Sequence, residues 1–178
     1  MTTQRIARIA LLTSVCHVSR VMFGFIPNVQ PMTVILILIT LVFGFSDGLI
    51  VAILSMLISN LQMGMGVWTI AQTGSFAMII IATSLIRPFY KKIHPFLLAI
   101  FAGSMGLFYG FSISLGQSFF FTWISFFPYW ISGLPFDFLH AFGNIGFWFI
   151  LHPILIPMFE KIKKQENKTY HQSQKAGD

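Results

Sequence analysis

Three polar residues in the second half of the chain have the types and the spacing that chemistry could use. Asp137, His140 and Asn144 stand at positions i, i+3 and i+7, so they share one face of a helix. An aspartate beside a histidine can act in general acid–base catalysis. The same face could instead bind a ligand directly, relay a proton, or form a buried network that clamps Arg20 or the preceding loop.

Catalysis is the least favoured of these interpretations, because no companion motif supports an enzyme. The chain has no serine or cysteine in a nucleophile motif, no second carboxylate pair and no cluster with metal-ligand spacing. It also lacks the Gly-x4-Gly-Lys-Ser/Thr loop that binds ATP. We therefore expect no catalytic residues, no resident metal and no catalytic cofactor.

Other hydrogen-bonding residues occur where neighbouring apolar segments begin or end. They are five amides and one indole, namely Asn28, Gln30, Asn60, Gln62, Gln72 and Trp68. Near a membrane, a polar side chain must be paired, face a cavity or lie close to the headgroups. Neutral amides and rings favour a ligand with many hydrogen bonds over a bare ion. Simple contact with lipid headgroups is the alternative.

The elements that must position these residues are membrane helices. The 178 residues are 56% hydrophobic and only 9% charged, whereas about a quarter of an ordinary soluble domain is charged. Two long stretches each contain a single charge, which is Asp47 in residues 22–86 and Asp137 in residues 93–159. This pattern excludes a disordered chain, a disulfide scaffold and a nucleic-acid module, and it predicts one all-α integral membrane domain.

Glycine, proline and polar residues divide the chain into six predicted transmembrane spans. The spans are residues 6–25, 31–45, 48–61, 68–90, 95–115 and 135–159, with a tight turn at Ser46-Asp47-Gly48. Residues 117–133 are aromatic but interrupted by Pro128, so we expect a short interfacial helix there. Residues 1–159 form the membrane domain, and residues 160–178 form a polar cytoplasmic tail, disordered beyond its first turns.

The distribution of basic residues sets the orientation. With six crossings and both termini in the cytoplasm, ten of the 11 Lys and Arg residues are cytoplasmic, and only Arg20 lies in the outer half. A seventh crossing would place the basic tail outside, against the positive-inside rule. The first span also carries Ala7, Ala10 and Ser14 on nearly one face, where small side chains would let a partner helix approach closely.

Two parts of the sequence resemble a known family. The block GLPFDFLHAFGN (residues 133–144) resembles the last-helix signature of the substrate-binding S components of energy-coupling factor (ECF) vitamin transporters. The segments IPNVQP (residues 26–31) and GMGVWTIAQ (residues 64–72) are similar to the subgroup that includes cobalamin-type S components. The resemblance extends from the first span to the last.

The resemblance implies a bacterial plasma-membrane protein that binds a vitamin or vitamin precursor from outside. Such proteins dock on a membrane scaffold subunit that carries two ATPase subunits, and they topple in the membrane to release the ligand. Only the partner subunits use ATP. The resemblance assigns partner docking to small residues of the first helix, here Ala7, Ala10 and Ser14, although the usual motif has alanine where this chain has Ser14.

We therefore predict an S component, with a corrinoid as the first candidate ligand and pantothenate or folate as alternatives. A stand-alone secondary carrier or channel, and a structural assembly factor, are the rival classes. The predicted ligand contacts are Asn28, Gln30, Asn60, Trp68, Gln72, Tyr129, His140 and Asn144. Arg20 and Asp137 are expected to shape the pocket.

Overall fold

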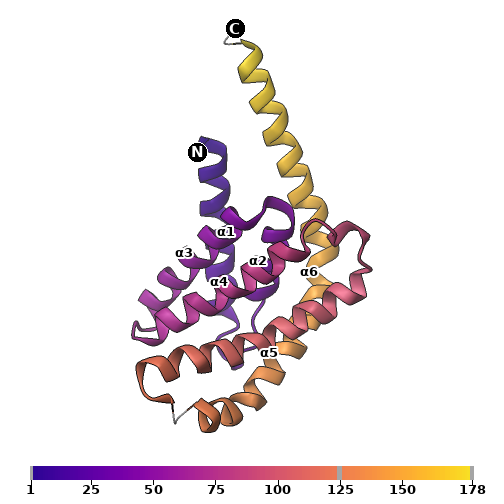
Figure 1. The fold of residues 1–178 in the computed structure, drawn as a ribbon. Helices are drawn as coiled ribbons and strands as arrows, with labels where there is room; N and C mark the ends of the chain where they lie inside the picture. Colours follow the sequence, from indigo (N-terminus) through magenta and orange to yellow (C-terminus); the bar gives the residue numbers. More distant parts are fainter. Residues whose placement is uncertain (1, 124–125, 177–178) are drawn as a thin grey trace.

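The computed structural model describes residues 2–123 and 126–176, which contain six α-helices and no strand (Figure 1). The helices are α1 (Thr3–Met22), α2 (Met32–Phe43), α3 (Phe45–Met63), α4 (Trp68–Ile86), α5 (Pro95–Phe120) and α6 (Phe126–Ala176). A short 3-10 helix, η1 (Tyr90–Lys92), lies between α4 and α5. The prediction of an all-α chain is confirmed for these residues.

Within the described residues, four helices are long and apolar enough to cross a membrane, by length and composition. They are α3, α4, α5 and the Phe126–Thr169 part of α6. α2 is apolar but has only 12 residues, which corresponds to roughly 18 Å of helix against a hydrocarbon core of about 30 Å. α1 carries Arg5, Arg8 and Arg20. The chain is therefore compatible with a multi-pass membrane protein.

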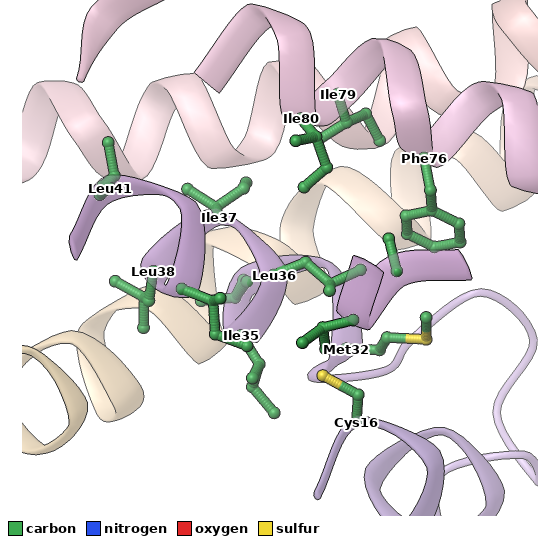
Figure 2. Packing of buried hydrophobic residues seen from close by; sticks show 14 of the residues in the cluster. Cys16, Met32, Ile35, Leu36, Ile37, Leu38, Leu41, Phe76, Ile79 and Ile80 are labelled. Carbon is green, nitrogen blue, oxygen red and sulfur yellow. The ribbon is translucent and has the colours of Figure 1, made fainter. Parts of the chain in front are cut away.

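α2 forms the centre of the bundle. Its side chains are apolar apart from Thr33 and Thr40, and those from Met32 to Val42 are all buried. A helix that is hydrophobic all round is stable when protein surrounds it, and α2 contacts each of the other five helices. Figure 2 shows its side chains beside Phe76, Ile79 and Ile80 of α4, with Cys16 of α1 near Met32.

The break between α2 and α3 differs from the predicted turn. It is the single residue Gly44, with φ 106°, and Ser46, Asp47 and Gly48 already belong to the first turn of α3. Glycine has no Cβ, so it adopts this backbone conformation readily and ends α2 without a longer loop. Asp47 then stands near the amino end of α3, where a negative charge is favourable.

No separate interfacial helix precedes the last span in the described residues. The expected segment is divided between the end of α5, which reaches Phe120, and the beginning of α6, which starts at Phe126; residues 124–125 of that segment lie outside the described part. Pro128 stands in the first turn of α6, where its missing N–H would have no helical partner. Proline therefore begins this helix instead of interrupting it.

The carboxyl-terminal segment is also more ordered than predicted. α6 continues as helix to Ala176 instead of ending near residue 159. Several contacts attach its first polar turns to the rest of the chain; among them, Lys163 Nζ donates to the carbonyl oxygen of Val42 at 2.7 Å, and Glu166 pairs with Arg8. Ordering this segment costs conformational entropy, and these contacts help to offset that cost.

Ionic contacts join several elements at one end of the bundle. Arg5 Nη2 lies 2.6 Å from Asp47 Oδ1, and Arg8 pairs with both Asp47 and Glu166. Asp47 is buried, so two cations balance a carboxylate that has lost its water. We call this end, which carries the start of α1, the α2–α3 break, η1 and the polar part of α6, the basic end.

Candidate functional site

A polar cavity of about 340 Å³ lies at the opposite end of the bundle. Side chains from the α1–α2 loop and from α4, α5 and α6 meet there, although the sequence separates them widely. The lining residues are Asn28, Gln72, Tyr109, Gly110, Ile113, Ser114, Tyr129, Ser132, Gly133, Phe136 and Asp137. Amides, phenols, hydroxyls and one carboxylate give this cavity both donors and acceptors.

Asp137 supplies the charge of the polar cavity. Its side chain lies directly against α5 at Gly110, where an added Cβ would come within 1.9 Å of the carboxyl carbon. Only glycine at this position leaves room for the carboxylate, and Asp137 itself is buried. The close approach of α5 and α6 at this point therefore holds Asp137 at the cavity wall, where the sequence predicted a pocket-shaping role.

Tyr109 is a cavity residue that sequence reasoning did not select. Its ring is buried in α5, 5.0 Å from the Phe76 ring and 5.2 Å from the His140 ring. Tyrosine counts as an apolar residue within an apolar span, so its hydroxyl gave no local signal. One signal could have pointed to Tyr109, which is that α5 contains no other tyrosine.

A buried hydrogen-bond network supports Gln72 from behind. Arg20 Nη1 donates to Asn60 Oδ1 at 2.9 Å and also bonds Ser59. Asn60 Nδ2 donates in turn to Thr69 Oγ1 at 3.1 Å and to Gln72 Oε1 at 2.9 Å. Arg20 and Asn60 thus join α1, α3 and α4 and orient the Gln72 amide, while neither lines the cavity.

The partners of Arg20 correct one expectation. Among the described residues, Arg20 bonds Met56, Ser59 and Asn60, so the group around Asp137 does not clamp it. Neither a single sequence nor helical spacing could show that α3 would supply these partners.

His140 and Asn144 lie inside the bundle, away from the cavity wall. His140 Nε2 is 2.8 Å from Thr33 Oγ1 of α2, and Asn144 Nδ2 donates to the Ala102 carbonyl oxygen of α5 at 3.0 Å. Both side chains are almost fully buried. They tie α6 to α2 and α5, and the structure does not bring them to the polar cavity as ligand contacts.

The remaining predicted contacts divide between the cavity and the surface. Asn28, Gln72 and Tyr129 line the cavity. Gln30 is half-buried outside it, and Trp68 is 46% exposed, with its ring covering Gly66 so closely that an added Cβ would lie 2.2 Å away.

The predicted docking face of α1 is open. Ala7, Ala10 and Ser14 are all exposed, and the Ser14 hydroxyl donates to the Ala10 carbonyl oxygen at 2.9 Å. The Ser14 hydroxyl is therefore satisfied within its own helix.

Fold and cavity together define an all-helical chain with several helices able to cross a membrane and a polar hollow at one end. Within the described residues, no group of three or more His, Cys, Asp or Glu side chains could hold a metal ion. Comparisons of the chain with models of protein families, with curated proteins and with solved structures found no match.

Proposed function

We propose that the protein is the substrate-binding S component of an ECF-type vitamin transporter and binds its ligand in the polar cavity. The observation that carries this proposal is the convergence of Asn28, Gln72, Tyr109 and Asp137 on one hollow from four separate parts of the chain. Ligand pockets are typically concave sites of about 300–1,000 Å³ with a few placed polar groups. The cavity has that size and composition.

The proposal includes six crossings of a bacterial plasma membrane, with both termini in the cytoplasm. The grouping of Arg5, Arg8, Arg87, Lys91 and Lys163 at one end supports this orientation. α2 is shorter than a membrane is thick, but its neighbours surround it, so its ends need not meet lipid.

The cavity favours a compact ligand. Its volume lies near the lower limit for ligand pockets, whereas a corrinoid is several times larger and would need the outer loops to open. The Asp137 carboxylate also favours a neutral or cationic group beside it, because an anion such as pantothenate or folate would be repelled. We therefore place a small vitamin or precursor with an N–H or O–H donor ahead of these three candidates.

Delivery would require partners. The chain has no ATP-binding loop, so a membrane scaffold subunit with two ATPase subunits would supply the energy. The exposed Ala7, Ala10 and Ser14 face is the proposed docking surface for that scaffold, and toppling of the docked protein would release the ligand inside.

Ligand binding by the purified protein tests the proposal. Mass spectrometry of the detergent-solubilised protein should find a co-purifying vitamin or precursor, and titration with a vitamin panel should give one tight binder. Tyr109→Phe should weaken binding about fivefold, the effect of one lost hydrogen bond. Tyr90→Phe, the matched control at the basic end, should leave affinity unchanged.

Two outcomes would contradict the proposal. Uptake by vesicles containing only this protein would indicate a secondary carrier or channel. The absence of binding to any small molecule, with the protein folded, would favour an assembly factor.

A further inference from the structure

A second, larger hollow lies at the basic end and takes no part in the proposed ligand site. It has a volume of about 940 Å³ and is formed by the end of α4, by η1 and by the polar part of α6, over the last residues of α2. Its lining comprises Leu41, Val42, Ser84, Arg87, Pro88, Tyr90, Lys91, Lys92, Glu160, Lys163, Lys164 and Asn167. Five cations face one carboxylate, and we call this site the basic hollow.

Two of the five cations are fixed by the backbone beneath them. Arg87 Nε donates to the Leu41 carbonyl oxygen at 3.2 Å. The Val42 carbonyl oxygen accepts from Arg87 Nη2 at 3.4 Å and from Lys163 Nζ at 2.7 Å. These carbonyls belong to the last turn of α2, where the helix dipole is negative and cations are favourable. The α2 terminus therefore holds two positive charges in place without neutralising either.

The other three cations leave positive charge unbalanced. Lys91 Nζ lies 2.6 Å from Glu160 Oε1, which also accepts from the Tyr90 hydroxyl at 3.1 Å. The hydrogen bond to Glu160 raises the pKa of Lys91, so Lys91 remains a cation. Among the residues that the structure describes, Lys92 and Lys164 have no ion-pair partner. Glu160 is the one carboxylate that lines the hollow, and it neutralises the charge of Lys91. Four positive charges therefore remain in excess.

The surroundings of the hollow suit an anionic lipid better than a soluble anion. The hollow adjoins the end of α4, one of the helices able to cross a membrane, and Leu85 and Phe89 next to it are 72% and 59% exposed. A headgroup bound among the lysines would lay its acyl chains over such side chains, which a soluble phosphate compound would not need. Basic pockets at the ends of transmembrane helices are suited to anionic headgroups.

We propose that the basic hollow binds an anionic phospholipid through its phosphodiester group. The fixed pair, Arg87 and Lys163, would receive the phosphate oxygens, and Lys92 and Lys164 would close over them from the rim. The volume exceeds that of one phosphate group, so a lipid with two phosphodiesters, such as cardiolipin, should bind more tightly than one with a single phosphodiester. This assignment does not depend on the ligand of the polar cavity.

Lipid retention by the delipidated full-length protein tests the assignment. Native mass spectrometry would compare cardiolipin, phosphatidylglycerol and phosphatidylcholine at equal concentration, and we expect retention in that order. The double variant Lys92→Gln/Lys164→Gln should bind cardiolipin roughly thirtyfold more weakly, the effect of removing two cations near an anionic lipid. Both side chains are exposed, so the fold should survive.

The control variant is Lys161→Gln/Lys168→Gln, which removes the same charge from α6 outside the hollow and should retain wild-type binding. Equal losses in the two double variants would overturn the proposal, because binding would then follow net charge alone. Equal retention of phosphatidylcholine would also overturn it. Complete displacement of cardiolipin by an equimolar amount of pyrophosphate would identify a site for free phosphate compounds and would reject the lipid.

Discussion

At the scale of single residues, the polar cavity depends on the absence of a side chain at Gly110 as well as on the carboxylate of Asp137. The carboxylate occupies the volume that any side chain at position 110 would take. A glycine in the middle of a helix costs up to about 1 kcal/mol relative to alanine, so its presence in α5 requires a compensating role. Making room for a buried carboxylate is such a role.

We predict that Gly110→Ala weakens binding of the co-purifying ligand at least about tenfold, because Asp137 must leave the wall or α5 must separate from α6. Titration of the purified variant measures this change. Gly74→Ala in α4 is the control, since nothing lies within 4 Å of its added Cβ and alanine should stabilise the helix slightly. Unaltered affinity in Gly110→Ala would mean that Asp137 does not shape the binding site.

At the scale of elements, the end of α2 shows how a short central helix is held in register. Gly44 ends it with a positive φ, and Arg87, directly after α4, and Lys163 of α6 bind its last carbonyls. The Arg87 guanidinium lies so close that a Cβ on residue 44 would come within 3.1 Å of Nη1. Gly44 therefore ends α2 through its backbone conformation, and Arg87 caps the same end of the helix.

Gly44→Ala should lower the thermal unfolding temperature in detergent more than Gly64→Ala does. Both glycines have a positive φ, 106° and 110°, so alanine should cost about 1–3 kcal/mol of backbone strain at either position. Only at position 44 must the methyl group also displace a guanidinium, because nothing lies within 4 Å at position 64. Equal shifts in the two variants would show that Arg87 does not contribute to holding this turn.

At the scale of the whole molecule, charge separates the two ends of the bundle. The basic end contains ionic contacts among Arg5, Arg8, Asp47 and Glu166, and the opposite end contains the polar cavity, with Asp137 as its one carboxylate. Such an asymmetry supports the proposed orientation, in which the basic end lies in the cytoplasm.

Cysteine labelling tests this orientation, because the native Cys16 is completely buried and should not react. A membrane-impermeant maleimide added to intact cells should label Gln62→Cys, which is exposed near the cavity end. It should label Gln165→Cys at the basic end only after the cells are permeabilised. Labelling of Gln165→Cys in intact cells would place the carboxyl-terminal part outside and contradict the proposed topology.

Composition and local pattern were enough to predict the helical class and most helix positions; the cytoplasmic side of the basic residues stays a prediction. Apolar runs, prolines and glycines act on the residues beside them, so they can be read along the chain. The same local signals misplaced the α2–α3 break by two residues, because they cannot show which of several small residues adopts the positive φ. They also predicted a disordered tail, because the contacts of Lys163 and Glu166 are made with distant elements.

Tertiary structure decided which of the polar residues selected from the sequence line the polar cavity and which do not. The sequence placed Asp137, His140 and Asn144 on one helical face, but α5 turns Asp137 toward the cavity while α2 and α5 bind the other two inside the bundle. Tyr109 also lines the cavity, although it lies in an apolar span. Which polar groups meet depends on how each helix is rotated and how closely it packs against its neighbours, and that information lies in the complementary shapes of several helices together.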